Sequence, residues 1–212
     1  RIVKQVMKLM GNRFEISVVT DDETDGCAEE QISKGVSEIQ RIEKLLTTYD
    51  PASQTNQINE QAGIRPVKVD KEVFDLIERS IKISSITQGA FDISYGSIDK
   101  RLWNFDKTMT ELPDAATAKR SVRLINYKNI LLDKNECTIF LKETGMRIGF
   151  GGIGKGYAAE RAKIVMQQNG VTNGIVNASG DLTTWGLQPD GKPWAVGIAD
   201  PDNITKAFSW LT

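Results

Sequence analysis

Regular spacing of apolar positions predicts that strands and helices follow one another along the first part of the chain. Residues 14–19 alternate apolar and polar side chains, as a half-buried strand does. In residues 28–46 apolar side chains recur at intervals of three and four, which predicts one long amphipathic helix. Similar spacing over residues 73–84 predicts a second helix, which we expect to end before Gly89.

The middle of the chain is predicted to contain a third helix followed by a β-meander. Residues 113–124 open with proline and aspartate, two residues typical of a helix start. Apolar runs at residues 130–132 and 138–141 flank a polar turn and predict two antiparallel strands. We expect residues 146–148 to form the third strand of this meander, because a second turn precedes them.

A glycine-rich run then leads into a helical pattern over residues 157–168. Two more strands are predicted at residues 174–178 and 194–199, and another apolar segment begins at residue 208. Helices and strands are mixed without strict βαβ alternation. We therefore expect an α+β fold, with antiparallel sheet segments and packed helices, in preference to a doubly wound α/β fold.

Composition excludes several classes of function. The formal net charge of −1 gives no bulk attraction to nucleic acid or to an anionic membrane surface. No apolar run is long enough for a transmembrane helix, and no signal peptide is visible. The absence of histidine excludes a Ser-His-Asp triad or a His-ligated zinc within these residues. Cys27 lies near a helix start, and Cys137 alternates with Ile139 and Leu141, which predicts a buried strand thiol.

The most informative feature for chemistry is the glycine-rich run at residues 149–157. Its nearly bare backbone, the ammonium of Lys155 and the helix that follows would together form a cradle for an anion such as phosphate. A glycine-rich turn in a tightly packed fold is the alternative. The run lacks the later acidic residue of a dinucleotide-binding unit, and Gly156 stands where a P-loop requires Ser or Thr.

Three further loops carry candidate ligand-binding side chains. Asp92, in a turn with glycine and an aromatic residue, could accept hydrogen bonds from a ligand or could cap a turn. Asp181 follows a strand and small residues, where it could face a metal or ligand or could close a turn. Tyr49 could stack on a planar ring or pack in the core. No base is available to activate a serine or threonine, so no nucleophile is predicted.

Taken in order, these segments resemble the ApbE family, the FAD:protein FMN transferases. The matching motifs lie at residues 10–12, 46–53, 58–59, 89–92, 151–158, 176–181 and 193–198. The resemblance covers nearly the whole chain and implies that residues 1–212 are a single ApbE-like catalytic domain. The family's later motifs carry a histidine and acidic and threonine metal ligands. The chain ends before them, so we expect the domain to be truncated on its C-terminal side.

The resemblance implies a magnesium-dependent transferase that binds FAD, releases AMP and attaches FMN through a phosphoester to a threonine of a target protein. That partner would be a redox-pump or electron-transfer subunit. An FAD pyrophosphatase giving FMN and AMP, or a non-catalytic flavin-binding protein, are the alternatives. Family members usually work outside the cytoplasm, which implies the periplasm or the outer face of the inner membrane of a bacterium. Any membrane attachment would be that of a lipoprotein, through an anchor absent from this chain.

Site residues also follow from the resemblance, position by position. The implied FAD contacts are Met10, Tyr49, Ala90, Phe91, Asp92, Gly149 and Lys155, and the implied metal ligand is the backbone carbonyl of Gly152. Asp181 is added to the expected FAD contacts because of its place after a strand and small residues. Asn12 stands where the family has threonine, and Gly149 stands where it has aspartate, so only the backbone can serve at position 149. The general base is expected beyond Thr212, and no catalytic side chain is assigned.

Overall fold

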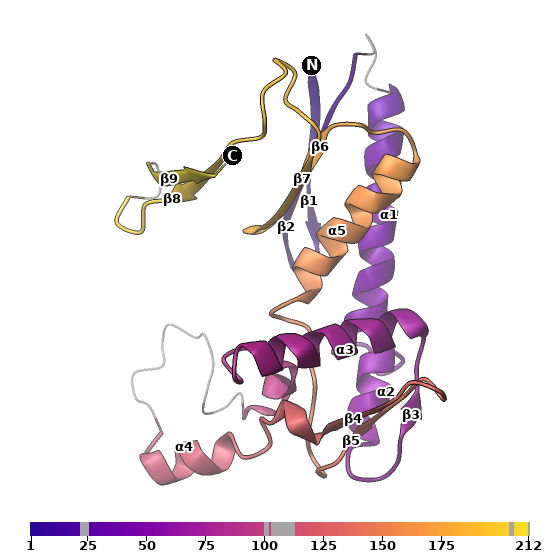
Figure 1. Cartoon of the computed structure of the whole chain (residues 1–212), viewed down its shortest axis with the longest axis vertical. Coiled ribbons are helices and arrows are strands. Elements are labelled where there is room, and N and C mark those ends of the chain that lie inside the picture. The colour runs from indigo at the N-terminus through magenta and orange to yellow at the C-terminus, as the bar shows by residue number, and fades with distance from the viewer. Residues whose placement is uncertain (22–25, 100–101, 103–112, 204–205, 212) are drawn as a thin grey trace. The chain divides into compact units, whose positions relative to one another are not determined.

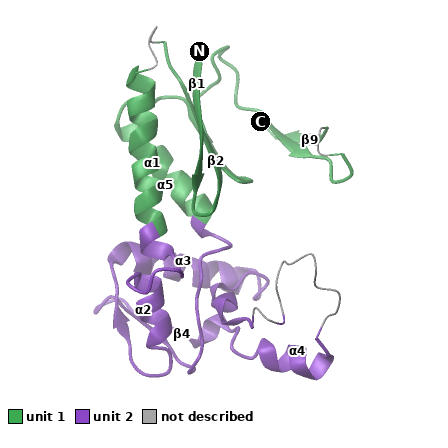
Figure 2. Ribbon diagram, turned by 180° about the vertical axis from the view of Figure 1, so that it is seen from behind, with its two compact units in different colours: residues 1–43, 155–212 green, residues 44–154 purple. Residues whose placement is uncertain are grey.

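A computed structural model of the chain describes every residue except 22–25, 100–101, 103–112, 204–205 and 212 (Figure 1). The described residues form two compact units (Figure 2). Unit 1 comprises Arg1–Glu43 and Lys155–Thr212, and unit 2 comprises Lys44–Gly154. The fold is α+β, as predicted, and all paired strands are antiparallel in the described part. A single catalytic domain over the whole chain stays a prediction.

Unit 1 is built on a four-stranded sheet with the strand order β1-β2-β6-β7. Its strands are β1 (Ile2–Leu9), β2 (Asn12–Val19), β6 (Gly174–Ala178) and β7 (Asp181–Trp185). The strands predicted at residues 14–19 and 174–178 are confirmed. The edge strands β1 and β7 were not predicted. In β7 three of five side chains are polar and none of the first four is buried, so its pattern is weak.

Two helices lie side by side on one face of this sheet, α1 (Gly26–Leu46) and α5 (Gly154–Gln168) (Figures 1 and 2). The core of the unit consists of fully buried apolar side chains from the sheet and from both helices, among them Phe14, Ile16, Val176, Ile32, Ile39, Ala158, Ala162 and Met166. The long predicted helix is confirmed, whereas α5 begins three residues earlier than predicted. No helix in the described ranges is long and apolar enough to cross a membrane.

A separate antiparallel hairpin of unit 1 contains β8 (Val196–Ala199) and β9 (Ala207–Leu211). It confirms the strand predicted at residues 194–199 and the apolar segment that begins at residue 208. Every side chain of β9 is exposed.

Unit 2 combines helices with a small sheet of order β3-β5-β4. Its helices are α2 (Gln54–Glu60), α3 (Lys71–Ile86), α4 (Ala115–Ser121) and the short 3-10 helices η1 (Ile93–Ser97) and η2 (Tyr127–Asn129). Its strands are β3 (Val67–Lys68), β4 (Ile130–Asp133) and β5 (Thr138–Leu141). The helix predicted over residues 73–84 and the strands at 130–132 and 138–141 are confirmed. The third predicted helix is shorter than expected and ends at Ser121.

Helix α2 was missed because six of its seven residues are polar and Ile58 is its one apolar residue. Residues 146–148 were wrongly predicted to be a strand, although their backbone groups are paired. The N–H of Ile148 donates to Asn59 Oδ1 (2.7 Å), and Asn59 Nδ2 donates to the carbonyl of Ile148 (3.1 Å). The hydroxyl of Ser97 accepts from the N–H of Arg147 (2.8 Å) and donates to the carbonyl of Arg147 (2.9 Å). Side chains therefore take the place of a neighbouring strand.

The prediction of a buried strand thiol at Cys137 is also wrong. Cys137 is half-buried in the turn before β5 and has a φ of 55°, in the left-handed region, so it cannot continue the strand. Cys27 is exposed at the start of α1, and both cysteines are free thiols.

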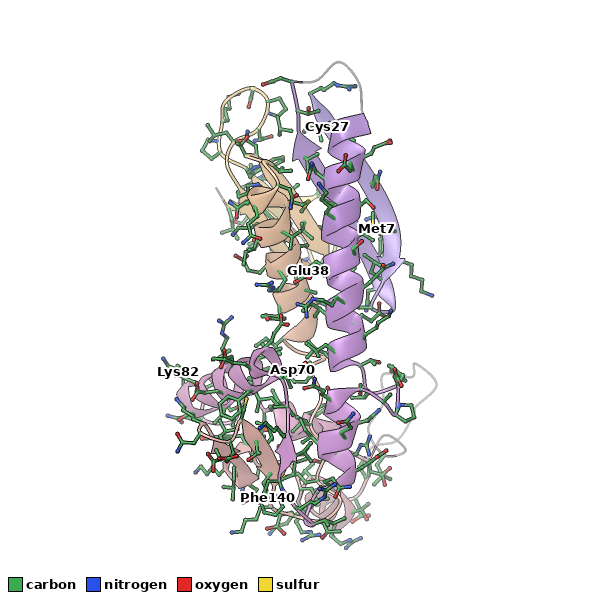
Figure 3. The ribbon with its side chains drawn as sticks, turned by 90° about the vertical axis from the view of Figure 1, so that its right-hand side faces the viewer. Met7, Cys27, Glu38, Asp70, Lys82 and Phe140 are labelled. Carbon is green, nitrogen blue, oxygen red and sulfur yellow. The ribbon has the colours of Figure 1, made fainter. Side chains whose placement is uncertain are left out.

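An acidic side chain joins α1 to α5 inside unit 1. Glu38 accepts a hydrogen bond from Arg41 Nε (2.8 Å) and another from Arg161 Nε on α5 (3.0 Å). Its side chain is 11% exposed and lies between the two helices (Figure 3). The guanidinium of Arg41, followed by that of Arg161, holds the pKa of Glu38 below its ordinary value of 4.5.

Replacing Asn59 by alanine should destabilise the protein, because it leaves both backbone groups of Ile148 buried and unpaired. We expect the free energy of unfolding to fall by about 2–4 kcal/mol in urea denaturation. The matched control is Asn135→Ala, at an exposed turn position, which should change it by about 0.5 kcal/mol or less. A loss as small as the control's would show that Ile148 readily finds other partners.

The lowered pKa of Glu38 predicts a pH dependence of stability. A depressed folded-state pKa contributes stability that is present above the unfolded value and is lost as the pH falls through the folded value. Glu38→Gln should therefore reduce the urea midpoint at about pH 7 and have less effect at about pH 3. The control is Glu30→Gln, at an exposed position of α1 where Glu30 pairs with Lys34. In this variant the urea midpoint should change with pH as it does in the wild type. Equal losses at both pH values would contradict the prediction.

Candidate functional site

Two tight turns of unit 1 lie at the same end of its four-stranded sheet. The β1–β2 turn contains Met10 and Gly11, the β6–β7 turn contains Ser179 and Gly180, and the register of β2 with β6 places them together. All four residues have positive φ, at 50°, 72°, 57° and 100°. Positive φ at both central residues is the requirement of a type I′ hairpin turn. Met10 and Ser179 are unusual there, and such non-glycine residues are enriched at functional sites.

Side-chain amides stabilise both turns. Asn12 Nδ2 donates to the carbonyl of Met10 (2.9 Å), and Asn177 Oδ1 accepts from the N–H of Gly180 (3.0 Å). The amide of Asn12 thus closes the turn that carries Met10.

Lys155 and Asp181 meet at this same end of the sheet. Lys155 lies in the first turn of α5, and its Nζ is 3.0 Å from Asp181 Oδ2. The same ammonium donates to the carbonyls of Ala178 (3.3 Å) and Ser179 (3.4 Å). Its side chain is 23% exposed, against 48% for Asp181. The structure thus brings together two of the predicted FAD contacts and places the Met10 turn at the same sheet end.

The start of α5 is electrostatically suited to an anion. The first N–H groups of a helix have no acceptor within the helix and carry partial positive charge. The first turn of α5 contains no acidic residue, and Lys155 adds a full positive charge. Asp181 balances that charge when no ligand is bound. A phosphate oxygen could take the place of the carboxylate as the partner of Lys155.

In unit 2, the glycine run passes beside Phe91. A Cβ atom added to Gly152 would lie 3.2 Å from Cε2 of Phe91, so ring and backbone are in close contact. Gly149 donates its N–H to the carbonyl of Ile93 (2.9 Å), which fixes the start of the run. Gly151 and Gly152 are exposed, and a Cβ atom on Gly151 would meet nothing within 4 Å. The run is therefore anchored at its start and open at its centre.

Asp92 is a cap of η1 in this structure. Its Oδ1 accepts from the N–H (2.8 Å) and the hydroxyl (2.6 Å) of Ser94, and its Oδ2 accepts from the N–H of Tyr127 (2.9 Å). It also lines a surface hollow of about 420 Å³, together with Asn126 and Lys128. Both carboxylate oxygens are engaged, which is the structural alternative left open above. Contact of Asp92 with FAD stays a prediction.

Tyr49 is almost fully exposed to solvent. Its side chain is 89% exposed, so the alternative that it packs in the core is wrong. Ala90 is exposed as well. Sequence reasoning missed Asn56, whose side chain binds the backbone on either side of Tyr49. Two asparagines three positions apart, after a serine typical of a helix cap, were the available signal.

Candidate metal-binding side chains are known only for the part of the chain that the structure describes. Within the described ranges, no group of three or more His, Cys, Asp and Glu side chains could hold a metal ion. Gly152, the predicted carbonyl ligand, lies in unit 2, whereas Asp181 lies in unit 1.

Comparison with protein families and sequences finds one consistent group. The ApbE family matches residues 10–212. An FAD:protein FMN transferase of Klebsiella pneumoniae is 30% identical over 201 residues, which cover 95% of this chain and 60% of the relative. An FAD:protein FMN transferase of Salmonella typhimurium is 28% identical over 208 residues, covering 94% and 57%. The chain thus spans less than two thirds of the length of these relatives.

Solved structures give the same likeness. The ApbE protein of Thermotoga maritima superposes with a TM-score of 0.84 and 26% identity, covering 99% of this chain and 67% of that protein. The flavin transferase ApbE of Vibrio cholerae superposes with a TM-score of 0.82 over 95% of this chain and 64% of its own. At 19% identity the second likeness concerns the fold alone.

Replacing Asp92 by asparagine separates its two possible roles. The amide nitrogen cannot accept the hydrogen bond from Tyr127 or Ser94, so we expect the unfolding free energy without ligand to fall by about 1–3 kcal/mol. Asp75→Asn, in an exposed pair with Lys71 on α3, should change it by about 0.5 kcal/mol. Unchanged stability combined with a loss of FAD binding would instead support direct ligand contact.

Proposed function

Because the chain belongs to the ApbE family, we propose that it carries much of the nucleotide-binding machinery of an FAD:protein FMN transferase. The reaction would join FMN to a threonine hydroxyl of a target protein and release AMP. The observation that carries the proposal is the pairing of Lys155 with a partly exposed carboxylate at the start of α5. Such a lysine can exchange its carboxylate for the phosphate oxygens of a nucleotide.

The proposed transfer is a displacement at phosphorus. The threonine oxygen of the target attacks the phosphorus of the FMN half of FAD, and a new P–O bond forms. The bond between this same phosphorus and the bridging anhydride oxygen breaks, and AMP leaves with the bridging oxygen. The hydroxyl proton passes to a base, for which no described residue is proposed. Lys155 and first-turn N–H groups of α5 would stabilise the negative charge that develops on the phosphate oxygens.

Several other residues are proposed contacts of FAD. The exposed ring of Tyr49 is available to stack on the planar isoalloxazine. Phe91 and the open centre of the glycine run at Gly151 offer an apolar ring and a bare backbone. Ala90, Gly149 and Met10 are retained as proposed contacts on the strength of the family resemblance.

Magnesium dependence is part of the proposal and rests on the family. Mg²⁺ usually keeps several waters and binds through one or two carboxylates together with substrate phosphates. The described residues provide no cluster of three metal-binding side chains, so they do not by themselves fit a complete site. We therefore assign no reaction step to the ion, and the carbonyl of Gly152 stays a proposed ligand.

The partner and the location are also proposals from the family. The target would be a redox-pump or electron-transfer subunit with an acceptor threonine. The enzyme would act outside the cytoplasm, in the periplasm or on the outer face of the inner membrane, attached through a lipid anchor. The net charge of −1 supports a partner other than nucleic acid.

The test is to incubate the natural full-length protein with FAD and a peptide carrying a candidate acceptor threonine, with and without magnesium. AMP release and peptide mass are followed together. A magnesium-dependent gain of one FMN on the peptide would support the transferase. AMP release without that gain, also in the presence of several acceptor peptides, would favour the FAD pyrophosphatase. Bound FAD without either product would leave a flavin-binding protein.

In the same assay, Lys155→Ala should reduce kcat/KM by about a hundredfold to a thousandfold, as the loss of a charge-stabilising group does. Lys163→Ala is the matched control, because Lys163 lies on the same helix and pairs with Glu160 (2.9 Å). The control should keep activity close to that of the wild type. Wild-type activity in the Lys155 variant would remove Lys155 from the proposed machinery.

A further inference from the structure

We propose that Asn56 is a positioning residue for Tyr49, which fixes the backbone on both sides of the exposed ring so that the ring meets the flavin in one orientation. The inference rests on the proposed function, because it takes the flat ligand of Tyr49 to be the flavin of FAD. Asn56 lies on α2 and is 6% exposed, so its side chain can act only through the groups that it contacts within the fold.

The amide of Asn56 binds the carbonyls of the two residues next to Tyr49. Its Nδ2 donates to the carbonyl of Thr48 (3.0 Å) and to that of Asp50 (2.7 Å). An asparagine amide has two N–H donors, so both are used. Because one side chain holds the carbonyls of residues 48 and 50, it restricts the backbone of the residue between them, Tyr49.

Neighbouring side chains at the start of α2 bind further carbonyls of the same loop. The hydroxyl of Ser53 donates to the carbonyl of Thr47 (2.6 Å), and the hydroxyl of Thr55 donates to the carbonyl of Leu46 (3.1 Å). The carbonyls of residues 46, 47, 48 and 50 are therefore all bound by side chains of residues 53–56. The start of α2 thus acts as a template for the loop, and Asn56 forms the part nearest to Tyr49.

The ring itself gains no support from packing. With 89% of its side chain exposed, Tyr49 depends on its backbone for its place in the structure. Ordering a mobile loop on binding lowers affinity, and a loop that is ordered beforehand avoids that loss. Holding the carbonyls on both sides of Tyr49 is therefore expected to raise affinity for a planar ligand without adding any contact to it.

Asn56 also relates this loop to the start of the glycine run within unit 2. Its Oδ1 accepts a hydrogen bond from Arg147 Nη2 (3.3 Å), and Asn59, one turn along α2, pairs with both backbone groups of Ile148. One face of a single short helix thus fixes two segments that lie about a hundred residues apart in the sequence.

Cleavage by chymotrypsin after Tyr49 tests the positioning role without any ligand. The wild-type loop should be cut slowly although its ring is exposed, because a bound backbone resists entry into a protease. In Asn56→Ala, cleavage should be about tenfold faster or more, since two hydrogen bonds that oppose local opening are lost. Asn56→Asp, which keeps the shape and removes both donors, should behave alike, and circular dichroism verifies that each variant is folded.

The control is Ser80→Ala, which removes another buried hydrogen bond of unit 2, from Ser80 to the carbonyl of Leu76 (2.7 Å). Cleavage after Tyr49 should stay at the wild-type rate in this variant. Wild-type cleavage rates in both Asn56 variants would overturn the proposal, as would an equal acceleration in the Ser80 variant.

A double-mutant cycle on FAD affinity tests whether Asn56 acts through Tyr49. Asn56→Ala alone should weaken FAD binding by about tenfold, and it should cause no further weakening when Tyr49 is already alanine. Additive losses, or no effect of Tyr49→Ala, would overturn the proposal. If the wild type binds no FAD, the proposed function and the flavin part of this inference fail together. The protease rates still decide separately whether Asn56 fixes the loop.

Discussion

The need to pair the buried backbone of Ile148 organises unit 2. This residue lies in an extended segment that has no neighbouring strand, so its N–H and C=O must find partners among side chains. Asn59 supplies both, which explains an amide buried on a short polar helix. A further consequence falls on Gly96, where a Cβ atom would come within 2.8 Å of the carbonyl carbon of Ile148. The place where the glycine run begins is thus set by α2 and η1 together.

Apolar periodicity was sufficient for the elements that bury a continuous face. The long helix α1, helix α3 and strands β2 and β6 have such faces, and the sequence located each of them to within a few residues. Apolar periodicity did not predict α2, because its buried side chains are mostly polar and form hydrogen bonds with the backbone of loops. It misread residues 146–148 as a strand, because a segment paired by side chains has the same apolar content as one paired by a strand.

The sequence predicted several residues of the candidate site but not the contacts between them. Short motifs identified Lys155 and Asp181, but only the β6–β7 turn and the start of α5 bring these two side chains to 3.0 Å. Asp92 was recognised as a choice between ligand contact and cap, and its contacts with Ser94 and Tyr127 could not be read from spacing. The role of Asn12 was hidden for the same reason, since its partner is the carbonyl of Met10.

The pairing of Lys155 with Asp181 also has a consequence for selectivity among anions. A lone ammonium at a helix start would be repelled by the partial positive charge of the helix, and the carboxylate offsets that repulsion. With no ligand present, the two side chains form a neutral pair. A monovalent ion such as chloride then gains little, because it has to compete with a carboxylate of equal charge already in contact. If Lys155 binds phosphate as proposed, multivalent anions would be favoured over monovalent ones at this position.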